Sequence, residues 1–90
     1  MRTIKRTAQF KRDYKREKRR KQGINLDDIL LKAVKYLIAD TTLPVNMRDR
    51  ALIGNCRDCH IKPDLVLIYR KPDADTLELI RLGSHNELGF

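Results

Sequence analysis

The chain has 90 residues, of which 20 are lysine or arginine and 12 are aspartate or glutamate, so that its net charge is +8. A hydrophobic fraction of 41% is enough for a folded core and excludes wholesale disorder. The longest apolar run, residues 65–69, is too short to cross a bilayer, and no apolar stretch of a secretory signal follows the basic start. We therefore expect one domain, residues 1–90, in the reducing cytoplasm, with both cysteines as free thiols.

The positive charge predicts an anionic partner. A compact domain with a pI near 9.9 attracts nucleic acid, an acidic protein or both. The alternative is a basic surface that only keeps the protein soluble.

The first half of the chain predicts a short edge strand followed by a basic helix. The strand covers residues 2–6 and the helix residues 8–21, with Phe10 and Tyr14 four residues apart on the apolar side of the helix. Most other positions of the helix carry cations, namely Lys11, Arg12, Lys15, Arg16, Lys18, Arg19, Arg20 and Lys21. Because like charges four residues apart destabilise a helix, packing of the two rings or an anionic partner must hold it. Gly23 is its expected stop.

A second helix is predicted by the spacing of its apolar residues. Asn25 is its expected N-cap, and Asp27 and Asp28 favour the positive end of the helix dipole. Seven apolar side chains recur at helical spacing, namely Leu26, Ile29, Leu30, Ala33, Val34, Leu37 and Ile38. The helix is expected to end near Asp40.

The second half of the chain predicts strands. Residues 45–55 are expected to form a loop, 56–60 a short strand, 62–64 a turn, 65–69 a strand buried on both faces, 71–75 a turn, 76–82 a last strand and 84–90 a tail. The order is β-α-α-β-β-β. Two helices packed on one face of a small, mainly antiparallel sheet bury both apolar sets, so the predicted class is α+β.

Cys56, Cys59 and His60 match the spacing of a haem attachment site. In a strand, however, residues three apart point to opposite faces, so the two cysteines would diverge. A zinc site that adds His85 meets the same objection and lacks a second cysteine pair. The cysteines are therefore interpreted as small, partly buried strand residues, and we expect neither a metal nor another cofactor.

Four polar residues can meet at one edge of the sheet. If the last two strands form an antiparallel hairpin, Arg81 and His85 return beside His60 and Asp64. Two imidazoles, a carboxylate and a guanidinium suit general acid–base cleavage of a phosphodiester, because histidine both takes and gives a proton near neutral pH. The alternative is that the two histidines stand by chance in a surface loop and a tail.

The same residues carry a resemblance to a known family. Arg57-Asp-x-His60-Ile-x-Pro-Asp64, then Leu79-Ile-Arg81-Leu-Gly83-Ser-His85 and the terminal Phe90, resemble the YafQ-type toxins of the RelE superfamily. The loop at residues 50–54 is also similar to the family's Asp-His-x-Leu-x-Gly loop. The resemblance covers nearly the whole chain and implies a ribosome-dependent mRNA endonuclease that needs no metal and is neutralised by an acidic antitoxin.

The resemblance also implies roles for single residues. His60, Asp64, His85 and Phe90 fall on active-site positions of the family, and Arg81 on an arginine that would bind the scissile phosphate. Further RNA contacts are expected from Arg50, Arg57 and Lys62 and from the helix cations Lys11, Arg12, Lys15, Arg16 and Arg19. The chain is expected to be a monomer alone and a hetero-oligomer with its antitoxin.

Departures from the family pattern leave a second hypothesis open. Arg50 stands where the family often has histidine, and Leu65 where it often has tryptophan. Arg50 is therefore expected to clamp a phosphate instead of moving a proton. A non-catalytic module of the same fold, which binds RNA or an antitoxin, remains the alternative.

Overall fold

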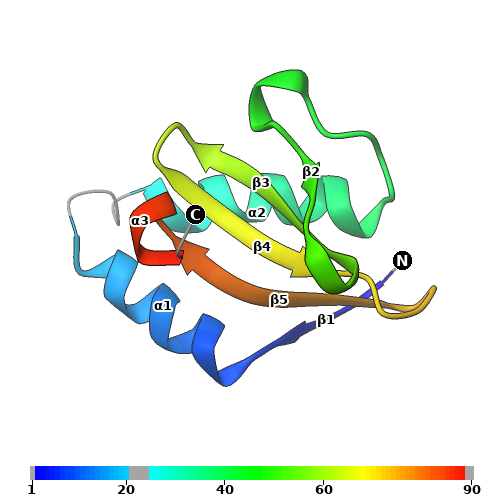
Figure 1. Cartoon of the computed structure of the whole chain (residues 1–90), viewed down its shortest axis with the longest axis horizontal. Coiled ribbons are helices and arrows are strands. Elements are labelled where there is room, and N and C mark those ends of the chain that lie inside the picture. The colour runs from blue at the N-terminus through cyan, green and yellow to red at the C-terminus, as the bar shows by residue number, and fades with distance from the viewer. Residues whose placement is uncertain (1, 21–24, 89–90) are drawn as a thin grey trace.

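The computed structural model describes residues 2–20 and 25–88 (Figure 1). It contains strand β1 (Thr3–Arg6), helices α1 (Ala8–Lys18) and α2 (Leu26–Ile38), strands β2 (Arg50–Ala51), β3 (Cys56–Lys62), β4 (Leu65–Arg70) and β5 (Thr76–Gly83), and a last helical turn, α3 (His85–Leu88). Two 3-10 turns, Val45–Met47 and Ile53–Asn55, flank β2. The predicted α+β class and element order are confirmed.

Three local predictions need correction. Arg50 and Ala51 pair with β3, whereas the whole 45–55 segment was expected to be a loop; two residues are too few to give a periodic signal. Residues 85–88 form a helical turn within the expected tail. Asn25 does precede α2, but its side chain makes no capping hydrogen bond, because its backbone is not extended (φ −110°, ψ 11°). Lys21, the predicted stop at Gly23 and Phe90 lie outside the described residues.

The five strands form one sheet in the order β1-β5-β4-β3-β2. The β2–β3, β3–β4 and β4–β5 pairs are antiparallel, and only β1 runs parallel to its neighbour β5. The register sets Val66 of β4 beside His60 on one side and beside Gly83 on the other. The end of β3 and the end of β5 are therefore two strands apart, which decides where the site forms.

The core lies between one face of the sheet and the two long helices. On β4 and β5 it includes Leu65, Leu67, Tyr69, Leu77, Leu79 and Leu82, and on the helices Phe10, Leu26, Ala33, Val34 and Leu37. Burial of each large apolar side chain is worth roughly 1.5–3 kcal/mol. The strand at residues 65–69, which was predicted to be buried on both faces, is buried at every position except Ile68, which is half-buried. Within residues 2–20 and 25–88, no helix is long and apolar enough to cross a membrane.

Helix α1 covers the part of β5 that β1 leaves unpaired (Figure 1). The Thr7 hydroxyl donates to the Ile80 carbonyl (2.7 Å), the Leu82 amide donates to the Asp13 carboxylate (3.1 Å), and Arg16 Nη2 donates to the Leu82 carbonyl (2.9 Å). Buried Phe10 anchors the helix as predicted, but the buried carboxylates of Asp13 and Glu17 do so as well. These two carboxylates offset part of the repulsion between the helix cations, through their ion pairs with Arg16 and Arg20.

Candidate active site

The two histidines of the chain meet at one end of the sheet. His60 is on β3 and His85 is the first residue of α3. Because Gly83 stands two strands from His60 in the register, the chain that leaves β5 brings His85 onto the His60 ring. The two Nε2 atoms are 3.2 Å apart, and the ring centroids are separated by 4.8 Å at an interplanar angle of 55°. The sequence predicted that the two histidines converge at one edge of the sheet, but not that their rings are in contact.

A capping box positions His85. The Glu87 amide donates to the Ser84 hydroxyl (3.2 Å), and the Ser84 amide and hydroxyl donate to the Glu87 carboxylate (3.3 and 3.0 Å). Hydrogen bonds from Arg20, opposed only in part by burial, lower the pKa of Glu87 to about 2, with Ser84 and Arg16 adding to the effect. The Ser-x-x-Glu spacing in the sequence could have predicted this turn.

The absence of a side chain at Gly83 lets α3 lie close to the sheet. A Cβ built at this position would lie 2.9 Å from Nη2 of Arg16 and 3.5 Å from Cδ2 of Leu88. An alanine here would therefore displace the end of the Arg16 side chain, whereas Leu88 would remain at an ordinary van der Waals distance.

The histidines open onto a hollow of about 370 Å³. Its lining is made of Arg48, His60, Pro63, Asp64, Ser84, His85 and Asn86. A second hollow, of about 420 Å³, shares Arg48, His60 and Pro63 with it and extends to Lys62 and Lys32. The two hollows adjoin at these three shared residues, and together they are lined by the imidazole pair, one carboxylate and three cations. Such a surface suits a phosphodiester chain.

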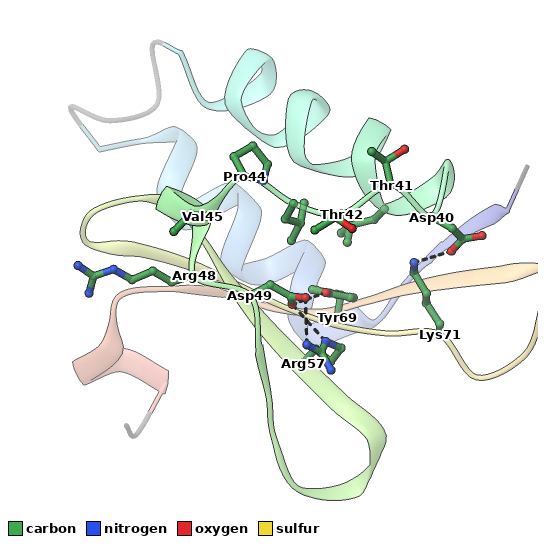
Figure 2. Close-up of a pocket in the computed structure, with 12 residues that line it drawn as sticks. Asp40, Thr41, Thr42, Pro44, Val45, Arg48, Asp49, Arg57, Tyr69 and Lys71 are labelled. Carbon is green, nitrogen blue, oxygen red and sulfur yellow. Dashed lines mark hydrogen bonds and ion pairs between the residues drawn. The ribbon is translucent and has the colours of Figure 1, made fainter.

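Arg48 is a site residue that the sequence did not reveal. Its backbone is left-handed (φ 48°, ψ 52°), a conformation that costs a side chain other than glycine or asparagine roughly 1–2 kcal/mol. Figure 2 shows its side chain directed away from Asp49, Arg57 and Tyr69. No carboxylate of the described residues pairs with it. Strained backbone concentrates at functional sites, and no sequence pattern marks this position in a loop.

Arg81 lies on the same face of the sheet as His60, but it does not line the hollow. Its Nε donates to Oδ2 of the buried Asp13 (2.7 Å). Burial raises the pKa of Asp13, but hydrogen bonds from Arg81, Leu82, Gln9 and Arg16 outweigh it and leave that pKa below its usual value. The structure therefore brings together three of the four predicted residues. The fourth, Arg81, instead neutralises the carboxylate of Asp13, whose burial the sequence did not reveal.

Arg50 and Arg57 each bind a carboxylate across the β2–β3 pair. Arg50 of β2 binds a carboxylate of β3, and Arg57 of β3 binds a carboxylate just before β2. Arg50 Nη2 donates to Oδ2 of the buried Asp58 (2.8 Å). Arg57 donates two hydrogen bonds to Asp49 (3.2 and 3.0 Å), which also accepts one from Tyr69 (2.6 Å; Figure 2). Burial raises the pKa of Asp49, but hydrogen bonds from Arg57 and Tyr69 outweigh burial and lower this pKa below its usual value. Both arginines thus hold the loop that carries Arg48 in place. Contact of either arginine with RNA stays a prediction.

The predicted cations of α1 fall into two groups. Lys11, Arg12, Lys15 and Arg19 are exposed and pair with no carboxylate of the described residues. Arg16 instead joins Asp13, Glu17 and Glu87 (2.9, 3.0 and 3.0 Å) and is part of the scaffold.

The cysteines diverge as expected for a strand. Cys59 is buried in the core, on the face opposite to His60, and Cys56 is half-buried. Burial raises the pKa of the Cys59 thiol to about 12, with smaller effects from Asp49 and Asp58, so this thiol is a poor metal ligand. Across residues 2–20 and 25–88, no group of three or more histidine, cysteine, aspartate or glutamate side chains could hold a metal.

A family model described as the bacterial toxin YafQ of type II toxin–antitoxin systems matches residues 2–89. The chain belongs to the YafQ family. The mRNA interferase toxin YafQ of Escherichia coli K12 is 33% identical over 92 residues, which cover 97% of this chain and 95% of that protein.

Solved structures of the family have the same fold. A chain of the E. coli DinJ–YafQ complex superposes with a TM-score of 0.84 at 32% identity, covering 98% of both chains. A metal-bound toxin from Helicobacter pylori superposes with a TM-score of 0.84 at 40% identity, covering 98% of this chain and 99% of that one. YafQ-family membership thus agrees with the resemblance of the sequence motifs.

Proposed function

We propose that this YafQ-family toxin is an endoribonuclease that cleaves mRNA on the ribosome by metal-independent acid–base chemistry. The observation that carries the proposal is the contact of the His60 and His85 rings in a hollow that also holds Asp64 and Arg48. The E. coli relative, an mRNA interferase, supports the choice of substrate.

The imidazole contact supplies both roles that the reaction needs. Two Nε2 atoms 3.2 Å apart form a hydrogen bond only when one carries a hydrogen and the other offers a lone pair. The ring with the lone pair takes the proton of the 2′-hydroxyl, whose oxygen attacks the adjacent phosphorus. For the acid role the other ring must be an imidazolium, with hydrogens on both nitrogens; it gives its Nε2 proton to the departing 5′-oxygen, and a 2′,3′-cyclic phosphate and a 5′-hydroxyl result. The step requires no water and no metal ion.

The charged neighbours assist in different ways. Arg48 and Lys62 stabilise the phosphate as negative charge builds up on it, and Asp64 orients an imidazole. A phosphate cannot fit between nitrogens 3.2 Å apart, so the rings must separate when RNA binds. The short α3, which carries His85, is the part that moves. Phe90 remains the proposed stacking ring for a base.

Charge supports the proposed partners. The unpaired cations of α1 would contact ribosomal RNA, and an acidic antitoxin would neutralise the toxin in the cytoplasm, where ribosomes are found. The whole chain, residues 1–90, would act as one toxin domain, a monomer until the antitoxin binds.

Primer extension on a translated message, with and without ribosomes, tests the activity. His60→Ala and His85→Ala should each lower cleavage by about 10²- to 10⁴-fold while the far-UV circular dichroism is unchanged. Lys35→Ala, on the exposed surface of α2, serves as the control. If both histidine variants remain folded and cut the message at the wild-type rate, the protein is instead a non-catalytic module.

A further inference from the structure

His85 is carried by a single turn of helix. This turn, α3, consists of four residues, His85–Leu88, and none of their side chains is buried. A backbone hydrogen bond from the Leu88 amide to the Ser84 carbonyl (3.0 Å) closes it. Because one turn of helix is unstable in water by itself, the position of α3 depends on contacts with other elements.

Two arginines at the end of α1 bind this turn. Arg20 Nη1 and Nη2 donate to Oε1 and Oε2 of Glu87 (2.9 and 3.0 Å), which makes a bidentate ion pair. Arg16 Nε lies 3.0 Å from Oε2 of the same carboxylate. The end of α1 and α3, 67 positions apart in the chain, are thus joined through one carboxylate (Figure 1).

The geometry of the Arg20–Glu87 pair gives it more weight than most surface ion pairs have. The Arg20 and Glu87 side chains keep 46% and 26% of their exposure, and an isolated pair of this kind adds little to stability. Here the carboxylate is bound bidentately and belongs to a network that includes Arg16 and Ser84. Both conditions raise the contribution of an exposed pair.

Glu87 transmits this hold to His85. Its carboxylate also accepts hydrogen bonds from the amide and the hydroxyl of Ser84 (3.3 and 3.0 Å). Residues on both sides of His85 are therefore joined to each other and to Arg20. A shift of Glu87 would carry the His85 imidazole with it, and the 3.2 Å approach of the His85 and His60 Nε2 atoms would be lost.

We propose that Arg20 is a positioning residue, which acts through Glu87 to keep the His85 imidazole beside that of His60. Arg20 does not line the histidine hollow, so it has no catalytic contact of its own there. Its ion pair holds the Glu87 end of α3, so the His85 end can still swing by the small distance that a phosphate needs and stay within the hollow. The proposal rests on the proposed function for the reaction that His85 serves, whereas the ring contact can be measured without RNA.

Proton NMR of the free protein reads the ring contact directly, because the chain has two histidines. The wild type should show a nuclear Overhauser cross-peak between the two rings, which His60→Ala assigns. Arg20→Ala and Glu87→Ala should each weaken this cross-peak about twofold or more. The double variant should weaken it no more than Glu87→Ala does alone, since Arg20 acts through Glu87. Arg19→Ala is the matched control: Arg19 is exposed and pairs with no carboxylate of the described residues, so the cross-peak should be unchanged.

A second variant separates positioning from folding. Arg20 Nη1 also lies 3.2 Å from Oε2 of the buried Glu17. Arg20→Lys keeps a cation for Glu17 but cannot donate two parallel hydrogen bonds to Glu87. Its cross-peak should therefore be weakened as well, while its thermal denaturation stays close to that of the wild type.

Cleavage of a translated message gives an independent measurement. With saturating message, the rate of Arg20→Ala should fall about tenfold while KM stays near the wild-type value, because a misplaced imidazole slows the chemical step and leaves RNA binding unchanged.

The outcomes separate this proposal from the proposed function. If the wild type lacks the cross-peak, if Arg20→Ala, Arg20→Lys and Glu87→Ala all keep it, or if Arg19→Ala weakens it equally, Arg20 does not position His85. A raised KM with an unchanged saturated rate would show that Arg20 binds RNA instead. If the wild type cuts no message but the cross-peak depends on Arg20 and Glu87, the nuclease proposal fails and the positioning role stands.

Discussion

The buried carboxylate of Asp13 allows a sharp prediction about stability. Its side chain has no exposed surface and accepts hydrogen bonds from Arg81 Nε (2.7 Å), Arg16 Nη1 (2.9 Å) and the Leu82 amide (3.1 Å). Asp13→Asn keeps the shape but removes the charge that both guanidinium groups face. Breaking a buried ion pair costs about 3–5 kcal/mol. Because the Arg81 and Arg16 side chains retain 31% and 33% of their exposure, we expect the lower end, about 3 kcal/mol.

Urea denaturation at several pH values measures this cost. The pKa of Asp13 is lower in the folded chain than its usual value of 3.8, so its stabilisation is fully present above pH 3.8 and is lost as the pH falls through the folded pKa. The difference in unfolding free energy between wild type and Asp13→Asn should therefore be largest at neutral pH and shrink in acid. Asp28→Asn, at an exposed carboxylate, should change stability by no more than about 0.5 kcal/mol.

Two results would refute this reasoning. One is an Asp13→Asn protein as stable as the wild type at pH 7. The other is a stability difference that stays constant when both proteins are measured well below pH 3.8, because an effect of shape alone would not depend on protonation.

Three further predictions concern the site and its support. Glycine fits the left-handed backbone at position 48, so the unfolding free energy of Arg48→Gly should stay within about 1 kcal/mol of wild type. Its cleavage rate should fall roughly ten- to a hundredfold, because the contact with the phosphate is lost. Arg48→Lys serves as the comparison, and full activity in Arg48→Gly would remove Arg48 from the site. Gly83→Ala forces the Nη2 end of the Arg16 side chain to move away from the Leu82 carbonyl, so thermal denaturation should report the loss of one hydrogen bond, about 1 kcal/mol. An unchanged melting temperature would show that Arg16 moves aside without a loss of stability. Glu87→Gln weakens the contacts with Arg20 and Arg16 and should lower the melting temperature at pH 7. Because the pKa of Glu87 is lowered from 4.5 to about 2 in the folded chain, the difference in melting temperature from wild type should fade between these two pH values. A difference that persists at pH 2 would show that charge is not the cause.

The elements that the sequence predicts best are those with a local cause. Helix α2 follows from apolar residues at helical spacing, and β4 from a short run that is apolar on both faces. The turns on either side of β4 then determine the antiparallel register, so the meeting of His60 and His85 could be predicted as well. A hairpin is a nearly local object, and its geometry depends on a few neighbouring residues.

Tertiary structure decided what depends on residues far apart in the chain. Asp13 and Arg81 are 68 positions apart, and no local pattern indicates that the carboxylate is buried or that it holds the arginine away from the hollow. Three other features likewise require the folded sheet. They are the left-handed backbone of Arg48, the pairing of Arg50 with Asp58, and the covering of β5 by α1. The physical reason is that burial and charge pairing are set by the whole fold, whereas spacing and turn chemistry are set by the local sequence.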